Sequence, residues 1–117
     1  MEITEERRAN VLILRLMGKL DASTSKALED TILPLIASGQ DRLVVELSQL
    51  DYISSAGLRV FLLAAKRINE AQGRMILCSL KDSVKQVFDI AGFSSFLNLA
   101  GSIEEAIKSC PPLRPTY

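Results

Sequence analysis

Histidine is absent from the 117 residues, which removes the commonest general base and the commonest zinc ligand. Catalysis by a Ser-His or Cys-His pair is therefore excluded, and a zinc hydrolase is disfavoured. Cysteine is scarce: Cys78 lies in an apolar run and Cys110 precedes a proline pair, without C-x-x-C spacing. We interpret both as buried or incidental thiols rather than as a disulfide or a metal site.

An excess of charge of one sign is also lacking, because 14 Lys and Arg balance 14 Asp and Glu, with no basic cluster. This balance argues against nucleic acid or an anionic membrane surface as the main partner. The first residues are acidic and Arg15 interrupts the apolar run 11–17, so neither a signal peptide nor a membrane span fits. We expect a cytoplasmic protein that contacts other proteins or small ligands.

The motifs of nucleotide chemistry are missing as well. Neither G-x-x-x-x-G-K-[ST] nor G-x-G-x-x-G occurs in the chain. No carboxylate pair or metal-ligand cluster stands out, because Glu104-Glu105 is better explained by the start of a helix. We therefore predict no catalytic residue, no metal and no cofactor.

Hydrophobic periodicity and turn residues predict strands that alternate with helices. The expected strands are an extended piece from Ile3, joined by a polar turn at 7–10 to 11–17 with Gly18 as its end, then 43–47, 75–78 and 96–99. The first expected helix is opened by 23–25, weakened or kinked by Pro34 near Leu33, and closed by Gly39. The second runs from about Ser55 to Gln72, with Gly73 as its C′ residue. The third is capped by Asp82 or Ser83 and stopped by Gly92, and the fourth runs from the Ser102–Glu105 capping box to Pro111-Pro112.

This order predicts an α/β fold with an N-terminal hairpin, a mostly parallel sheet with right-handed crossovers, and about four helices. The length suits one domain, which we place at 1–110, followed by a Pro-containing tail at 111–117.

The most informative stretch runs from the apolar residues 43–47 through a short loop to Ser54 and Ser55, which begin an apolar helix. A helix start has unpaired backbone N–H groups and a partial positive charge, so a hydroxyl there can cap the helix or carry a phosphate. Serine is a preferred N-cap residue in any protein, so position and type alone favour the cap.

Ser55, Arg59 and Lys66 lie near one stripe of this helix, with Leu62 or Leu63 between them. The stripe is either a solvated edge or a partner-binding edge that begins at the serine. Because the first loop and the start of this helix follow adjacent parallel strands, we expect both at the same end of the sheet.

Several segments together resemble a known family, the STAS domain, over essentially the whole chain. The segments are Gly18-Lys19-Leu20-Asp21, Asp51 through Val60 with Ser54-Ser55-Ala56-Gly57-Leu58, Gly73, and Val84-Lys85 through Phe88-Asp89 to Gly92. Within the family, the chain most resembles the single-domain bacterial anti-sigma factor antagonists. The resemblance implies a small α/β superhelix.

The resemblance also implies a mechanism. In that family, a partner that is both an anti-sigma factor and a serine kinase phosphorylates the loop serine. The unphosphorylated form binds this partner and frees the sigma factor, phosphorylation breaks the complex, and a serine phosphatase resets it. Aligned through Gly57-Leu58, the acceptor falls on Ser55, and the strand-end aspartate falls on Asp21. The implied partner surface comprises Asp21, Ser23, Ser54, Ser55, Gly57, Arg59 and Lys66.

One departure from the family pattern concerns the acceptor. Many members have Asp-Ser before Gly-Leu, whereas Ser54 occupies the aspartate position here and Ala56 follows Ser55. The missing carboxylate eases repulsion of a phosphate, and the second hydroxyl makes Ser54 an alternative acceptor. We expect the chain to act as a monomer or a weak dimer.

Two other functions compete with this switch. The chain could be a STAS accessory subunit of a lipid or anion transport system, with Ser55 as a structural helix cap. A small enzyme with Ser55 as nucleophile is disfavoured, because no base is in evidence. The leading interpretation is a binding protein and not an enzyme.

Overall fold

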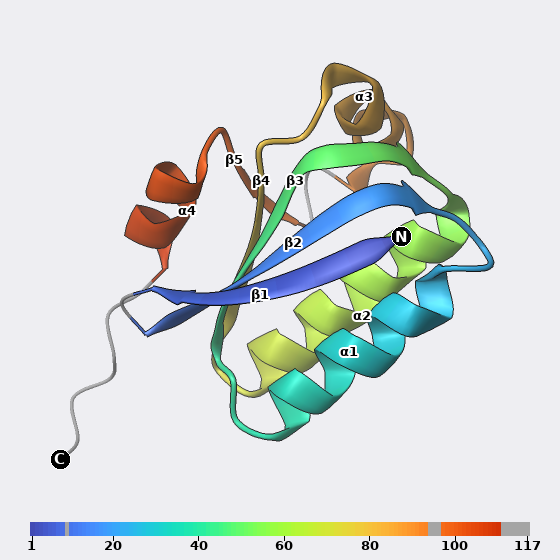
Figure 1. Cartoon of the computed structure of the whole chain (residues 1–117). Helices are drawn as coiled ribbons and strands as arrows, with labels where there is room; N and C mark the ends of the chain where they lie inside the picture. Colours follow the sequence, from blue (N-terminus) through green and yellow to red (C-terminus); the bar gives the residue numbers. More distant parts are fainter. Residues whose placement is uncertain (9, 94–96, 111–117) are drawn as a thin grey trace, which may run out of the picture.

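The computed structural model describes residues 1–8, 10–93 and 97–110 (Figure 1). In these residues one sheet has the strand order β1-β2-β3-β4-β5. The elements are β1 (Glu2–Arg8), β2 (Val11–Leu20), α1 (Ser25–Ala37), β3 (Arg42–Ile53), α2 (Ser55–Glu70), β4 (Arg74–Cys78), α3 (Asp82–Ile90), β5 (Asn98–Ala100) and α4 (Ile103–Ser109). The predicted α/β fold is confirmed.

The N-terminal hairpin pairs β1 with β2 antiparallel, from Glu2 opposite Met17 to Arg8 opposite Val11. Two details of the prediction were wrong. Arg7 and Arg8 belong to β1 rather than to a turn, and β2 continues through Gly18 to Leu20. Gly18 has a φ of 103° beside a register shift, a conformation that glycine adopts readily, so the strand bends there without ending.

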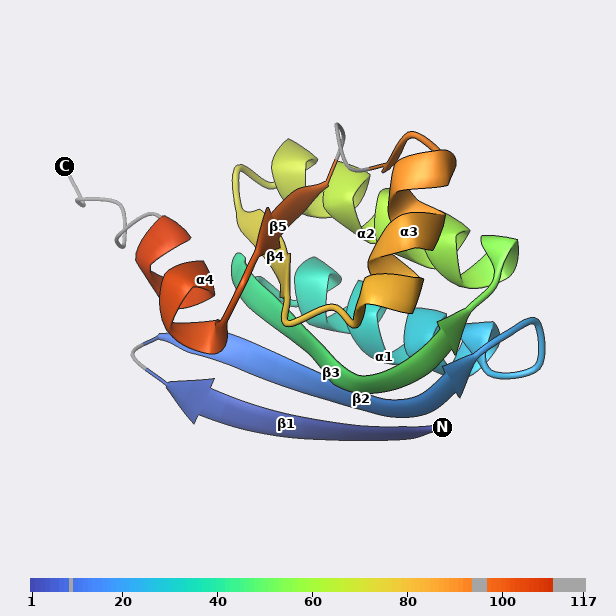
Figure 2. The same ribbon diagram turned by 90° about the horizontal axis from the view of Figure 1, so that it is seen from above.

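The rest of the sheet is parallel: β2 pairs with β3, β3 with β4, and β4 with β5. The predicted loop after Leu47 is instead part of β3, which reaches Ile53. Its register against β2 slips twice, between Glu46 and Gln49 and between Leu50 and Tyr52, with one extra residue in β3 each time. Such bulges bend a strand and increase its twist, so β3 curls over the helices at its carboxyl end (Figure 2).

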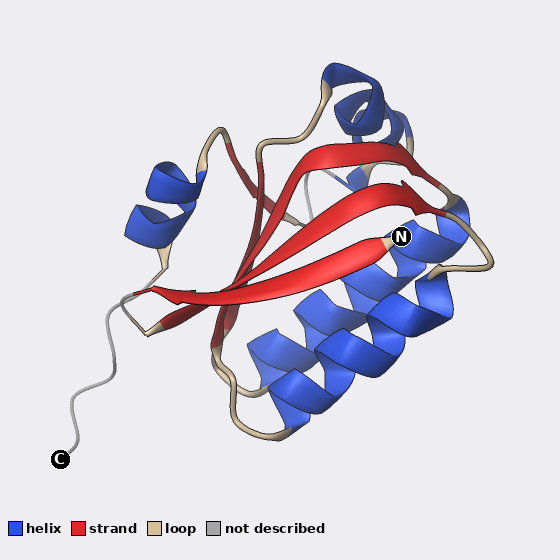
Figure 3. Cartoon of the chain, viewed as in Figure 1, coloured by secondary structure: helices blue, strands red, loops and turns tan. Residues whose placement is uncertain are grey.

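The two faces of the sheet are covered differently. Helices α1 and α2 lie side by side against one face (Figure 3), and α3 contributes Val84 and Phe88 to the same core. There the Phe61 and Phe88 rings pack with centroids 6.2 Å apart. On the other face Ala106 of α4 and Cys110, just after that helix, cover a smaller cluster with Val11, Ile13, Val44, Ile76 and Cys78.

The helix ends correct several predictions. Helix α1 continues through Pro34 to Ala37, so the proline does not end it, and a local weakening stays a prediction. Helix α2 ends at Glu70 rather than near Gln72, and Gln72, with a φ of 62°, occupies the C′ position that was predicted for Gly73. The N-cap of α3 is Lys81, without a side-chain hydrogen bond, because Asp82 and Ser83 already lie inside or at the start of the helix.

The predicted capping box of α4 is confirmed in its first half, because the Ser102 hydroxyl accepts a hydrogen bond from the Glu105 N–H at 3.2 Å. The Glu105 carboxylate accepts from Gly101 at 2.9 Å rather than from Ser102. The predicted strand start at Phe96, the helix end at Pro111-Pro112 and the tail 111–117 lie outside the described residues. None of the helices traced in 1–8, 10–93 and 97–110 has the length and apolar character that a membrane crossing needs.

Candidate functional site

The serine loop lies where two neighbouring parallel strands end. Leu20 and Ile53 are paired residues of β2 and β3, so Asp21 and Ser54 are the next residues along each chain segment. The Ser54 N–H donates a hydrogen bond to the Leu20 carbonyl at 2.9 Å. This bond fixes the start of α2 against the loop that leads into α1 (Figure 1).

The two serines have different surroundings. Ser54 is the N-cap of α2, and its hydroxyl oxygen accepts a long hydrogen bond from the Gly57 N–H at 3.4 Å. Ser55 is the first helical residue and is exposed, and within the described part of the chain its hydroxyl has no hydrogen-bond partner. The hypothesis that Ser55 is the structural cap was therefore wrong, because Ser54 fills that place.

Asp21 is fixed by its own loop. Its Oδ1 accepts hydrogen bonds from the Ser23 hydroxyl at 2.7 Å, the Ser23 N–H at 2.9 Å and the Thr24 N–H at 3.1 Å. These bonds, the Ser23 hydroxyl first, hold the pKa of the Asp21 carboxyl below its usual value. A charged carboxylate of defined orientation thus stands at the end of β2, one residue beyond the Leu20 carbonyl that binds Ser54.

Gly57 does not contribute to an exposed surface, contrary to the expectation for the partner-binding set. It is buried, and a Cβ atom at this position would lie 2.7 Å from Leu20 Cγ and 3.1 Å from Ile53 Cγ1. The missing side chain allows the first turn of α2 to approach the ends of β2 and β3. Gly57 therefore positions the serine loop by close packing.

The predicted stripe on α2 is exposed at its charged positions. Arg59 and Lys66 are solvent-exposed, and within the described residues neither forms an ion pair, while Leu62 and Leu63 between them are half-buried. Arg59 lies one turn after Ser55, on the same side of the helix. Lys66 is eleven residues from Ser55, about 16 Å along the helix axis, so it extends the surface without reaching the loop.

Two neighbours of the loop were missed from the sequence. Lys81, at the start of α3, forms an ion pair with Asp51 near the end of β3. The Tyr52 side chain next to Asp51 is 49% exposed, unusual for a large aromatic residue. The sequence could have pointed to Tyr52, because it is an aromatic residue close to the two serines. No local pattern links Lys81 to Asp51, which lies 30 positions earlier.

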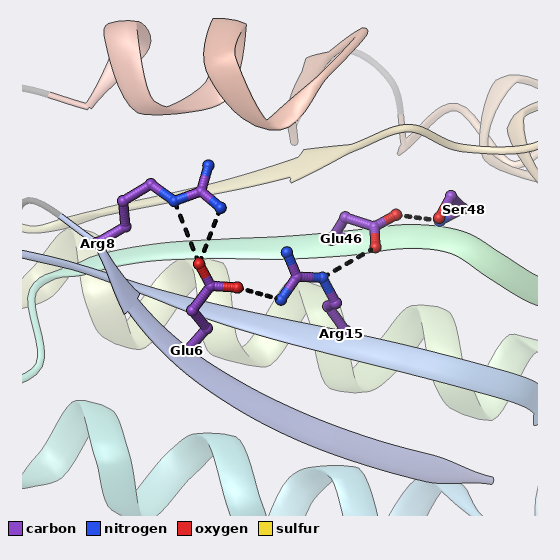
Figure 4. A network of polar contacts seen from close by, with 5 residues as sticks. All are labelled: Glu6, Arg8, Arg15, Glu46 and Ser48. Atoms are coloured by element: carbon purple, nitrogen blue, oxygen red, sulfur yellow. Dashed lines mark hydrogen bonds and ion pairs between the residues drawn. The ribbon is translucent and has the colours of Figure 1, made fainter.

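A polar network supports β3 from the face opposite α2 (Figure 4). Glu46 is only 7% exposed, and its Oε1 accepts a hydrogen bond from the Ser48 N–H at 2.6 Å, inside the first bulge. Its Oε2 lies 3.6 Å from Arg15 Nε, and Arg15 also binds Glu6 at 2.5 Å. The carboxylate thus satisfies a backbone donor in the bulge, where the ladder is locally disrupted, and stabilises the bend that leads to the serine loop.

The thiols and carboxylates offer no second reactive centre in the residues that the structure describes. Cys78 and Cys110 are free and buried, and burial raises the pKa of the Cys78 thiol to about 11. Residues 1–8, 10–93 and 97–110 contain no group of three or more Cys, Asp or Glu side chains arranged to hold a metal ion.

Comparison with known proteins relates this arrangement to one family. The model of the STAS domain family matches residues 2–106. The chain is 42% identical over 106 residues to BtrV of Bordetella bronchiseptica, named as a candidate anti-sigma factor antagonist, with 91% of each chain covered. It is 33% identical over 93 residues to the anti-sigma F factor antagonist of Paenibacillus polymyxa, covering 79% of this chain and 80% of that one.

Solved structures agree with the fold. An anti-sigma factor antagonist from Mycobacterium paratuberculosis superposes with a TM-score of 0.85 at 19% identity, covering 93% of this chain and 92% of that one. The Bacillus cell fate determinant SpoIIAA in its phosphorylated form superposes with a TM-score of 0.67 at 23% identity, covering 92% and 97%. At these identities the likeness concerns the fold alone.

Proposed function

The chain belongs to the STAS domain family, and from this premise we propose that it is an anti-sigma factor antagonist, a regulatory protein that acts by binding an anti-sigma factor. The names of its relatives support this class of function. The observation that carries the proposal is the exposed Ser55 hydroxyl at the first position of α2, on a segment that the Ser54 N–H joins to the residue before the fixed Asp21 carboxylate.

The partner we propose is an anti-sigma factor that is also a serine kinase. It binds the unmodified chain over the surface formed by Asp21, Ser23, Ser55 and Arg59, and it then phosphorylates Ser55. Ser55 is favoured over Ser54 because the Ser54 hydroxyl caps α2, whereas the Ser55 hydroxyl is exposed. A serine phosphatase that removes the phosphate completes the cycle.

A phosphate at Ser55 changes the charge of the surface without a need to refold the domain. It adds about −1.5 to −2 charges at neutral pH, which the positive end of the α2 dipole stabilises locally. Arg59, one turn further on and without an ion pair in the described residues, is placed to attract the phosphate. Arg59 is then no longer available to the partner, and the surface gains negative charge next to Asp21. Both changes weaken the complex.

Binding measurements test the proposal. Calorimetry with the anti-sigma factor encoded nearest to this chain's gene should give a tight complex with the unmodified protein and a weaker one with the phosphoprotein. Ser55→Ala should bind like the unmodified chain, and Ser55→Asp should bind more weakly, although a carboxylate carries less charge than a phosphate. Equal affinity of the phosphoprotein and the unmodified chain would overturn the switch.

A pull-down from cells addresses the class of function. Capture of an anti-sigma factor with kinase activity supports the proposal. Capture of a transport ATPase in its place would instead assign the chain to a transport system. Hydrolase activity that disappears in Ser55→Ala would replace the binding function with an enzymatic one.

A further inference from the structure

A crevice of about 290 Å³ lies at the carboxyl ends of β4 and β5. Its lining includes the half-buried residues Leu80 and Leu99, together with Ala100 and Gly101. The serine loop follows β2 and β3, so the crevice is formed by different strands and none of the predicted partner-binding residues line it.

The crevice follows from the way the chain leaves these two strands. After β4 the chain enters α3, whose Val84 and Phe88 pack in the same core as α1 and α2. After β5 it enters α4, whose Ala106 packs in the cluster on the opposite face. Figure 2 displays α3 and α4 on opposite sides of β4 and β5. Adjacent parallel strands whose connections part in this way leave an opening outside their carboxyl ends, the position at which open α/β sheets bind ligands.

The backbone at the mouth of the crevice is held in an uncommon conformation. Ser79, the first residue after β4, has a φ of 60°, which side chains other than Gly, Asn and Asp seldom adopt. Its N–H donates a hydrogen bond to the Ala100 carbonyl at 3.2 Å, which joins the two strand ends. This bond fixes the backbone on the side of the opening that Ser79 and Ala100 form.

Two charged residues that line the crevice, Glu105 and Lys85, differ in their hydrogen bonds and ion pairs. Glu105 reaches back to the Gly101 N–H at 2.9 Å and lies in the first turn of α4, where a carboxylate is favourable. Lys85 of α3 is exposed, and within the described residues it forms no ion pair. The Glu105 carboxylate is thus held at the start of α4, and the charged group of the lining without a side-chain partner in the described residues is the Lys85 ammonium, next to Leu80 and Leu99.

We propose that this crevice binds a small organic anion, whose carboxylate or phosphate pairs with Lys85 while its apolar body packs on Leu80 and Leu99. The volume is at the lower end of ligand pockets, about 300 Å³, so the anion is of the size of a substituted benzene ring. The proposal is independent of phosphorylation at Ser55, because it involves other strands and other residues.

Nuclear magnetic resonance of the whole chain tests the proposal with four probes: benzoate, phenyl phosphate, phenol and inorganic phosphate. The amide chemical shifts of Ser79 and Gly101 should change with the concentration of benzoate or phenyl phosphate and reach saturation. The tighter-binding probe shows whether the site prefers a carboxylate or a phosphate. Phenol lacks the charge and inorganic phosphate lacks the apolar body. Each should therefore bind at least about fivefold more weakly than the better of the two anionic probes.

Two variants complete the test. Lys85→Gln should weaken binding of the better probe about fivefold, because it removes the cation, whereas Lys108→Gln, an exposed lysine of α4 that does not line the crevice, should bind as the wild type does. Absence of a saturable shift at Ser79 and Gly101, an unchanged affinity in Lys85→Gln, or equal binding of phenyl phosphate and inorganic phosphate would each overturn the proposal.

Discussion

Ser54 donates its backbone N–H to the carbonyl oxygen of Leu20 at 2.9 Å, and this bond joins the end of one parallel strand to the start of the helix that follows its neighbour. Because Asp21 comes directly after Leu20 and Ser55 directly after Ser54, the bond brings the charged loop and the exposed hydroxyl together. The partner surface proposed for this protein therefore depends on a backbone contact that substitution of either serine side chain leaves in place.

The phosphorylation site gives the first prediction. Incubation with the cognate kinase and ATP should add one phosphate, which peptide mapping by mass spectrometry places at Ser55. Ser54→Ala should still be phosphorylated, whereas Ser55→Ala should not, because Ser55 carries the exposed hydroxyl. Modification of Ser54 in the wild-type chain would contradict the assignment.

Helix capping distinguishes the same two serines by stability. Ser54→Ala should lower the free energy of unfolding by about 0.5–2 kcal/mol, towards the lower value because the capping bond to Gly57 is 3.4 Å long. Ser55→Ala should change it by less than about 0.5 kcal/mol, since Ser55 is an exposed position inside the first turn. Urea unfolding of both variants measures the difference, and a larger loss in Ser55→Ala would show that the roles are reversed.

Charge reversal tests the α2 surface. Arg59→Glu should weaken the complex with the anti-sigma factor while leaving the thermal unfolding midpoint nearly unchanged, because Arg59 is exposed and makes no ion pair within the described residues. The matched control is Lys108→Glu, which reverses an exposed charge on α4, away from the serine loop. Equal affinities of the two variants would identify the stripe as a merely solvated edge.

Close packing at Gly57 gives a prediction on stability. Gly57→Ala gains about 1 kcal/mol of helix propensity, yet its Cβ would meet buried Leu20 at 2.7 Å, and overpacking costs about 1–3 kcal/mol. We expect a net loss of stability. In a double-mutant cycle, Gly57→Ala should cost less in a Leu20→Ala background, since alanine lacks the Cγ and Cδ2 atoms that the new Cβ would meet. Strict additivity in chemical unfolding would argue against a clash between the two residues.

The Asp21 carboxyl predicts a pH dependence. Its pKa in the folded chain lies below 3.8, so the folded state binds this proton more weakly than the unfolded chain does. The resulting stabilisation is complete above the unfolded pKa and is lost as the pH falls through the folded pKa. Unfolding curves from pH 2 to 7 should therefore converge for the wild type and Asp21→Asn at the acidic end.

Ser23→Ala provides the control for this pH effect. It removes the hydroxyl that lowers the Asp21 pKa most, so it should shift the acid loss of stability toward a higher pH. An identical pH profile of Ser23→Ala and the wild type would mean that the Ser23 hydroxyl has no part in holding the carboxylate charged.

The sequence predicted those elements that depend on neighbouring residues. Alternating apolar residues identified the hairpin and the parallel strands, and the Ser102 cap followed from a local motif. The same local signals placed both serines at the start of α2. They could not decide which serine caps the helix, because both have the side chain that a cap needs, and the choice depends on where the strand before them ends.

The errors came from residues whose roles are set by distant partners. Residues 48–53 look like a loop by composition, yet they continue β3, because β2 pairs with them across two bulges. Glu46 is buried in a strand because Arg15 of β2 and the Ser48 N–H compensate its charge. Gly57 looked like part of a recognition motif, and its burial against Leu20 becomes visible only when the helix is packed on the sheet.

Strand β1 forms one edge of the sheet, and five of its seven residues are charged: Glu2, Glu5, Glu6, Arg7 and Arg8. Exposed edges are templates on which further strands can be added, and charged side chains there oppose stacking of copies. Under the proposed function each free molecule binds one anti-sigma factor, so the response depends on the number of free molecules. Self-association along β1 would lower that number, so under the proposed function the charges at this edge keep the protein available to its partner.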